Sequence, residues 1–304
     1  MSDFRETPQC SPGTLLAKPR PIGATDADTD HRHTGRDATP RAQLPFARHT
    51  LRSMALPRPK GQRSGTDCRH GARTVRYPPG RTWPFAQRFA EAGIAALLFD
   101  HRGFGDSAGE PDLFHPRRQL EDWAAAIAFA RSLAGVDPDR VATLGSSMGA
   151  GNALAAAAVA VDRGIAAVVS QVPFLDVVTQ AHRSSLGVSL LIFSAALRGR
   201  HVRAIGRPNE PAFINAPGGE GGWLHVVSIG EHSRWRDRVS SRWLLGRPYR
   251  PIRHARGLHC PWLFCVGEGD RVARPGPAIR AARADPLGEL RTHSTSTTGS
   301  STSW

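Results

Sequence analysis

Three residues with a defined spacing could perform chemistry in this 304-residue chain: Gly145, Ser147 and Gly149, in the pattern Gly-x-Ser-x-Gly. A serine hydroxyl is a weak nucleophile, so it must project from a sharp turn where a base can reach it. The glycines remove the Cβ atoms that would collide where such a turn brings a strand and a helix together. The pattern therefore predicts a nucleophile elbow with Ser147 at its tip.

The segments on either side of Ser147 supply the strand and the helix that an elbow requires. Residues 141–144 form a short apolar run typical of a buried strand, and residues 152–161 are alanine-rich and predict a helix. A helix that begins just after Ser147 has unpaired N–H groups in its first turn, so the Met148 N–H is a candidate oxyanion donor. An ordinary strand–turn–helix without chemistry is the alternative interpretation.

Helices and strands alternate around the elbow. Residues 83–92 predict a helix, 94–99 a buried strand, 119–133 an amphipathic helix and 166–170 another strand. This alternation predicts an α/β fold in which helices cover both faces of a mostly parallel sheet. Ligands of such sheets bind beyond the carboxyl ends of the strands, where Ser147 is expected.

The composition bounds the possible partners. The formal net charge is +14, which raises the question of nucleic acid, but nearly all of the positive charge is arginine, since Lys18 and Lys60 are the only lysines. We interpret this bias as codon usage and expect no nucleic-acid partner. The four cysteines have neither disulfide nor zinc spacing, so no metal and no cofactor are expected. They are Cys10, Cys68, Cys260 and Cys265.

Hydropathy predicts neither a signal peptide nor a membrane span. No apolar stretch follows the first basic residues, and the longest apolar runs, near 153–161 and 186–197, are too short to cross a bilayer. We therefore expect a cytoplasmic chain without a membrane partner. The sequence leaves the oligomeric state open.

The two ends of the chain differ from its centre. Residues 1–80 are rich in proline and arginine and have no sustained hydrophobic period, so we expect them to be disordered. Residues 292–304 form a polar, low-complexity tail. Because the change is abrupt at both ends, we hypothesise that these segments are read out of frame or come from a damaged gene.

Several motifs together resemble the α/β-hydrolase family. They are the segment 99–107, Phe-Asp-His-Arg-Gly-Phe-Gly-Asp-Ser, the segment 136–140, Val-Asp-Pro-Asp-Arg, and the elbow around Ser147. The nearest branch is that of bacterial dienelactone hydrolases and serine aminopeptidase-like esterases, and the resemblance spans about 81–291. It implies an α/β-hydrolase fold with a cap-like insertion at about 177–257. The sheet is expected to lack its N-terminal strands and its last strand and helix.

The resemblance also implies a catalytic triad in the chain order serine, acid, histidine. Asp270 matches the acid, because a glycine-rich loop presents it after the apolar run 261–266. Its role would be to orient the histidine and to stabilise the imidazolium ion. Capping of the following helix is the alternative role for Asp270, and Glu268 and Asp176 are reserve candidates for the acid.

The base and the oxyanion segment have weaker counterparts. His293 is the only histidine after Asp270 and matches the base, although it comes earlier than the family spacing implies and no final helix follows it. The alternative is a histidine in a frayed tail. The dipeptide His70-Gly71 matches the oxyanion segment of the family, but the residues before it do not read as a buried strand.

The sequence therefore predicts a serine hydrolase with a small-molecule substrate. Ser147 would attack an ester, a thioester or a small amide, and an acyl-enzyme would form. An α/β-hydrolase remnant without a competent base is the first alternative, and a basic nucleic-acid-binding protein is the second.

Overall fold

The computed structural model describes residues 13–19, 41–45, 50–56, 82–105, 107–133, 136–160, 164–180, 185–217 and 237–294. The α-helices are α1 (Thr82–Glu91), α2 (Pro116–Ser132), α3 (Met148–Val159), α4 (Val177–Gln180), α5 (Leu186–Leu197) and α7 (Gly276–Ala284), and the 3-10 helices are η1 (Ser241–Leu245) and η2 (Pro251–Gly257). The strands are β1 (Gly13–Pro19), β2 (Arg41–Pro45), β3 (Thr50–Leu56), β4 (Ala95–Phe99), β5 (Val136–Ser146), β6 (Ala167–Gln171), β7 (His201–Ile205), β8 (Ala212–Ile214), β9 (Val239–Ser240), β10 (Trp262–Gly267) and β11 (Gly288–His293).

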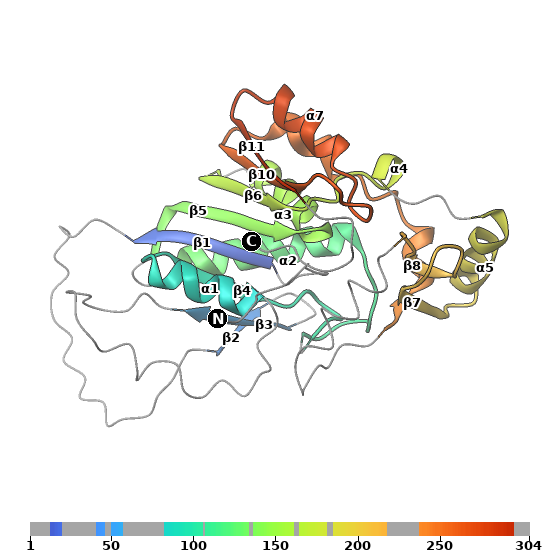
Figure 1. The fold of residues 1–304 in the computed structure, drawn as a ribbon. Coiled ribbons are helices and arrows are strands. Elements are labelled where there is room, and N and C mark those ends of the chain that lie inside the picture. The colour runs from blue at the N-terminus through green and yellow to red at the C-terminus, as the bar shows by residue number, and fades with distance from the viewer. Residues whose placement is uncertain are drawn as a thin grey trace, which may run out of the picture.

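The centre of the fold is an eight-stranded sheet in the order β11-β10-β6-β5-β1-β4-β3-β2 (Figure 1). The pairs β5–β6, β6–β10 and β10–β11 are parallel, whereas β1 is antiparallel to both β4 and β5. Strands β4, β5, β6, β10 and β11 consequently share one direction. Their carboxyl ends lie along the same edge of the sheet, where ligands bind in folds of this class.

Alternating side chains of β4 explain why helices cover both faces of the sheet. Leu97 and Phe99 are buried in a cluster with side chains of α2 and α3, whereas Ala96 and Leu98 are buried in a cluster with Ala86 of α1. Successive side chains of a strand point to opposite faces, so each face needs its own cover.

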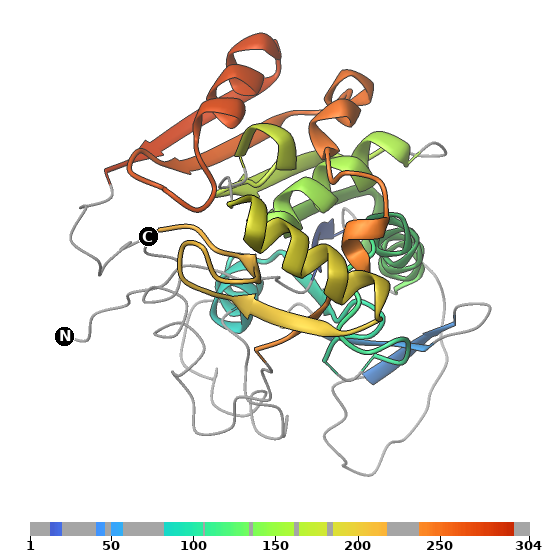
Figure 2. The same ribbon diagram turned by 90° about the vertical axis from the view of Figure 1, so that its right-hand side faces the viewer.

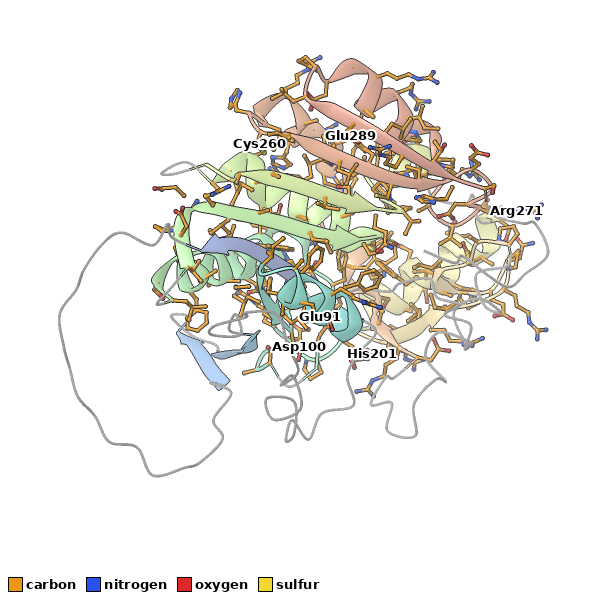
Figure 3. All side chains as sticks on the ribbon, turned by 60° about the vertical axis from the view of Figure 1, so that its left-hand side comes forward. Glu91, Asp100, His201, Cys260, Arg271 and Glu289 are labelled. Atoms are coloured by element: carbon orange, nitrogen blue, oxygen red, sulfur yellow. The ribbon has the colours of Figure 1, made fainter. Side chains whose placement is uncertain are left out.

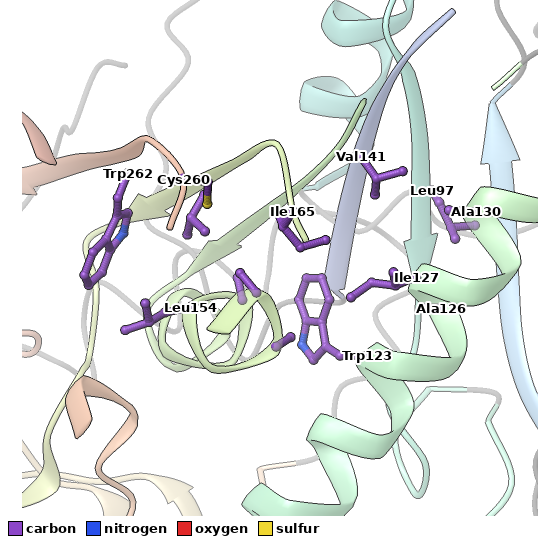
Figure 4. Packing of buried hydrophobic residues seen from close by; sticks show 14 of the residues in the cluster. Leu97, Trp123, Ala126, Ile127, Ala130, Val141, Leu154, Ile165, Cys260 and Trp262 are labelled. Carbon is purple, nitrogen blue, oxygen red and sulfur yellow. The ribbon is translucent and has the colours of Figure 1, made fainter. Parts of the chain in front are cut away.

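The larger cluster lies between the sheet and the helices α2, α3 and α7. Figure 4 shows part of it, with Trp123 and Ile127 of α2 beside Leu154 of α3 and Val141 of β5. Trp123 is fully buried, and its ring meets that of Phe99 edge to face with the centroids 5.1 Å apart. This packing fixes α2 and α3 against the strand that carries Ser147.

A smaller unit lies beyond the carboxyl ends of the central strands. It contains the three-stranded sheet β8-β7-β9 and helix α5, which coincides with the helix expected at 186–197 (Figures 1 and 2). This unit falls within residues 177–257, where the sequence predicts a cap. That these residues act as a cap stays a prediction.

Two expectations about the chain ends are wrong. The first 80 residues contribute β1, β2 and β3, so the sheet contains N-terminal strands that the sequence analysis expects to be absent. These strands span only five to seven residues and include polar and charged side chains, and such a stretch is too short for a periodicity search but long enough for a strand. The last strand is also present, because β11 pairs with β10 along its whole length.

None of the described helices is both long enough and apolar enough to span a membrane. The boundary expected at residue 81 and the frame hypothesis for the two ends stay predictions. Residues 295–304 lie outside the described part of the chain.

Candidate functional site

Ser147 occupies the sharp turn between β5 and α3. Its backbone has φ 52° and ψ −120°, a conformation that residues with a side chain rarely adopt. The Ser147 N–H donates to the Gln171 carbonyl at 2.9 Å, and the Ser147 carbonyl accepts from the Phe174 N–H at 3.0 Å. The turn is therefore tied on both sides to β6 and the loop after it, and these bonds sustain the strain.

Gly145 makes this turn possible, as the sequence predicts. A Cβ atom at Gly145 would overlap the Gly149 carbonyl group. Helix α3 crosses β5 at this point, and all its residues from Met148 to Ala157 are buried. A helix that is buried all round needs small side chains, which explains the glycines and alanines after Ser147.

A buried polar network holds the first turn of α3. The Tyr249 hydroxyl lies 2.5 Å from the Met148 carbonyl oxygen and 3.2 Å from Asn152 Oδ1, and the Asn152 amide donates to Gln119 Oε1 at 2.7 Å. Met148 is the first residue of α3, so its N–H has no partner within the helix. The network therefore holds the Met148 backbone in place next to Ser147.

Asp270 lies on the loop after β10. Its Oδ1 accepts from the Val272 and Ala273 N–H groups, both at 2.8 Å, whereas its Oδ2 accepts no hydrogen bond from any described residue. Burial raises the pKa of Asp270, although the two backbone N–H groups oppose this effect. The carboxylate is thus partly desolvated and forms no ion pair with a described residue.

Gln180 connects the loop of Asp270 to the loop beside Ser147. Its fully buried amide donates to the Pro173 and Arg274 carbonyl oxygens, both at 2.9 Å. Its Oε1 accepts from the Leu175 and Asp176 N–H groups at 2.5 and 2.9 Å. The loops after β6 and β10 are therefore held together by one side chain, and no sequence motif marks this residue.

His293 is the last residue of β11. The strand register places four residues in one row across β5, β6, β10 and β11: Ser146, Gln171, Cys265 and Arg291. His293 follows Arg291 by two residues, so it lies at the same edge of the sheet as Ser147 but three strand spacings away, about 14 Å. Its backbone carbonyl accepts from Glu268 at 3.0 Å, and its side chain is exposed. The structure does not bring His293 to Ser147.

A second histidine, not selected from the sequence, lies nearer to Ser147. Thr14 of β1 pairs with both Leu98 of β4 and Leu144 of β5, so these two leucines lie at the same height in the sheet. His101 follows Leu98 by three positions, and Ser147 follows Leu144 by three positions. Their backbones are two strand spacings apart, about 10 Å.

His101 is buried and bonded to an acid. Its Nδ1 lies 3.3 Å from Asp122 Oδ2, and its Nε2 has no hydrogen-bond partner among the described residues. Asp122 is fully buried and also accepts from the Arg102 side chain at 2.6 Å. This cluster anchors the loop after β4 to α2. Its signal in the sequence is an aspartate on the apolar face of α2, immediately before Trp123.

The remaining candidates have other positions or other roles. His70 and Gly71 lie outside the described residues. Asp176 binds the Arg250 guanidinium with two hydrogen bonds of 2.9 and 2.8 Å, which makes it a structural residue. Glu268 lies next to the β11 ladder, and its N–H bonds to His293.

The described cysteines are unsuited to nucleophilic chemistry. Burial raises the pKa of Cys260 to about 11 and also raises that of Cys265, so both remain thiols at neutral pH. Figure 3 shows Cys260 near the amino end of β10, whereas Arg271, next to Asp270, lies at the opposite end. Within the described ranges, no group of three or more His, Cys, Asp or Glu side chains could hold a metal ion.

Comparison with known proteins places these features in a family. A model of the X-Pro dipeptidyl-peptidase (S15) family matches residues 19–195, which include the elbow. The chain belongs to this family. The match begins well before residue 81, so the resemblance to hydrolases starts earlier in the chain than the motifs alone indicated.

Two relatives and one solved structure illustrate the likeness. The quorum-quenching protein AidA of Acinetobacter baumannii (strain MDR-ZJ06) is 37% identical over 223 residues, which cover 69% of this chain and 72% of AidA. Thiohydrolase aneE of Aspergillus aculeatus is 34% identical over 92 residues, 30% of this chain and 28% of that protein. The α/β hydrolase GrgF from Penicillium sp. sh18 superposes with a TM-score of 0.63 at 19% identity, over 84% of this chain and 90% of GrgF.

These likenesses and the sheet described above agree. The chain is a hydrolase of the S15 family with the α/β-hydrolase fold, as its motifs predict. Solved structures at such low identity support the fold alone. The chemistry has to be argued from the residues of the site.

Proposed function

We propose that this protein is a serine hydrolase that cleaves an ester, a thioester or a small amide through an acyl-enzyme on Ser147. The strained Ser147 backbone at the start of α3 is the observation that carries the proposal. The Ser147 Oγ attacks the carbonyl carbon, and the carbonyl oxygen becomes an oxyanion stabilised by the Met148 N–H. The leaving group departs with a proton, and water then releases the acyl group.

Asp270 is the proposed acid of the triad. It is partly buried, its Oδ2 accepts no bond from the described residues, and its pKa is raised by burial. An imidazolium ion beside Oδ2 would offset the desolvation of the carboxylate, which is the role that the acid has in such triads.

His293 is the proposed base, and it requires the end of β11 to leave the ladder. The pair Gly267–His293 and the bond from the Glu268 N–H to the His293 carbonyl would have to open. β11 is the edge strand and pairs with β10 alone in the described sheet, so opening its end breaks one ladder. A histidine must come within about 3.2 Å of the serine Oγ to take its proton.

The apolar surroundings of Met148 support a substrate with an apolar acyl group. Met148 shares a cluster with aromatic side chains that meet ring to ring: Phe114 and Phe213 at 5.4 Å, Phe213 and Trp243 at 4.8 Å, and Phe174 and Tyr249 at 6.2 Å between centroids. An apolar cluster beside the nucleophile favours an acyl chain over a charged group. The thiohydrolase relatives agree with a thioester as one substrate class.

The alternative is a catalytically defective hydrolase in which Ser147 has no base. The separation of about 14 Å between the positions of His293 and Ser147 in the paired β11 ladder favours this alternative. The two proposals differ in the reactivity of one hydroxyl, so one experiment separates them.

Labelling of the full-length protein with a fluorophosphonate probe tests the proposal. We expect Ser147 to be labelled, Ser147→Ala to abolish labelling, and His293→Gln to slow it by at least about 100-fold, because members of a triad act as a unit. The variant His101→Gln is the comparison, since it removes the nearer histidine. A folded protein that remains unlabelled would refute the serine hydrolase and leave the defective hydrolase. If labelling persists in His293→Gln but is lost in His101→Gln, the base is assigned wrongly.

A further inference from the structure

A cavity lies beside α3, next to the aromatic cluster that contains Met148. It is open to solvent on one side and has a volume of about 1040 Å³ between the start of α2, residues Asn152 and Ala155 of α3, and the segment 242–254. Neither Ser147 nor Asp270 lines it. Its volume is at the upper end of the range for small-molecule sites, so a ligand of nucleotide size can enter.

Positive side chains converge on this cavity. Six arginines line it: Arg117, Arg118, Arg242, Arg247, Arg250 and Arg253. We call the cavity with these arginines the arginine groove. Glu110 is the one acidic residue among the described lining residues. Codon bias explains many arginines along the chain, but it does not explain why six of them face one cavity.

Half of these arginines have acidic partners. Arg242 lies 3.0 Å from Glu110, and Arg118 lies 3.9 Å from the same carboxylate. Arg250 binds Asp176 with two hydrogen bonds. These pairs position the walls of the groove and leave its other cations uncompensated.

The guanidinium groups of Arg117, Arg247 and Arg253 have no acidic or hydrogen-bonding partner within the described ranges. Each is exposed, and like charges that face one cavity repel one another unless an anion lies between them. Helix α2 starts at this wall with Arg117 in its first turn and no acidic residue there, so its N-terminus adds to the positive potential.

Apolar side chains also line the groove. Phe114 is buried and Trp243 is half-buried, whereas Leu245 and Pro248 are exposed. A simple anion would contact the arginines alone, whereas a molecule with an apolar or aromatic part beside its anionic groups would contact both the arginines and the apolar side chains. Arginine also matches phosphate better than other cations do, because its planar fork donates two parallel hydrogen bonds.

We propose that the arginine groove binds a small molecule that carries two or more phosphate groups on an apolar or aromatic body, with Arg117, Arg247 and Arg253 as the phosphate ligands. The ligand lies against α3 five to eight residues after Ser147, about 8–12 Å along the helix. It adjoins Tyr249, whose hydroxyl bonds to the first turn of α3. The site is thus separate from the nucleophile but adjoins its support.

Calorimetric titration of the full-length protein tests this proposal, with ATP, tripolyphosphate and adenosine as probes in the absence of metal ions. We expect ATP to bind at one site per chain, tripolyphosphate to bind more weakly, and adenosine to show no measurable binding. Arg247→Gln combined with Arg253→Gln should weaken ATP binding at least about tenfold, since each change removes a charged hydrogen bond. Arg256→Gln combined with Arg283→Gln removes the same charge outside the groove and should change the affinity less than twofold.

Three results would overturn the proposal. If the two double variants weaken ATP binding equally, the net charge of the protein attracts ATP and no specific site exists. A single-stranded oligonucleotide that binds more than about 100-fold tighter than ATP would point to a nucleic acid instead. ATP binding no tighter than that of sulfate would leave the polyphosphate class without support. Fluorophosphonate labelling of Ser147 in the same variants separates a failure here from a failure of the serine chemistry.

Discussion

Replacement of Gln180 by alanine should destabilise the protein more than any surface change, because this side chain joins two loops through four hydrogen bonds. Its Oε1 accepts from the Leu175 and Asp176 N–H groups, and its Nε2 donates to the Pro173 and Arg274 carbonyl oxygens. A buried polar group left without a partner costs about 1–3 kcal/mol. Four groups would lose their partner at once.

Water reduces this penalty. Truncation of Gln180 to alanine leaves space for a water molecule that can pair with some of the four groups. We therefore expect the free energy of unfolding to fall by about 2–5 kcal/mol, below the sum of four separate penalties. Urea unfolding followed by tryptophan fluorescence measures this change.

Two further variants make the test specific. Thr179→Ala changes the exposed neighbour and should alter the free energy of unfolding by less than about 0.5 kcal/mol. Gln180→Glu keeps the acceptor but turns the donating nitrogen into an oxygen that faces two carbonyl groups, so it should destabilise at neutral pH and less so in acid. A loss below about 0.5 kcal/mol in Gln180→Ala would refute the claim that this residue holds the loops together.

Three other changes test the site. Tyr249→Phe removes the hydroxyl that bonds to Met148 and should lower the free energy of unfolding by about 1 kcal/mol in the same urea assay. Gly145→Ala forces a Cβ into the Gly149 carbonyl and should abolish Ser147 labelling, with circular dichroism as the control for folding. The raised pKa of Asp270 means that the folded state favours the protonated carboxyl, so its contribution to stability is present in acid and is lost as pH rises through that pKa. Asp270→Asn should therefore be more stable than wild type in urea at pH 7.5, and the difference should shrink towards pH 4.

The sequence predicted the centre of the fold because its signals there are local. The run 141–144 lies within β5, and the glycines around Ser147 have the close approach that their spacing indicates. Helix α5 coincides with the expected segment, and α2 contains nearly all of 119–133. Where apolar residues repeat over ten or more positions, the pattern determines the element.

The sequence failed where structure depends on partners far apart in the chain. β1 owes its place to backbone pairing with β4 and β5, which leaves no periodic trace in seven residues. The bond between His101 and Asp122 spans 21 positions and the bond from Gln180 to Arg274 spans 94, and no pattern of residue types marks such bonds. The same holds for the arginines of the groove, which are scattered from 117 to 253 and meet only in three dimensions.

The strained backbone of Ser147 implies that catalytic reactivity and thermal stability favour different residues at this position. A residue held at φ 52° and ψ −120° costs about 1–3 kcal/mol, and glycine would relieve most of that strain. Ser147→Gly should thus melt at a higher temperature than Ser147→Ala while being equally inert. Selection for thermal stability alone would favour replacement of Ser147 by glycine. A serine that is retained here in thermostable descendants would therefore indicate that its hydroxyl is still used.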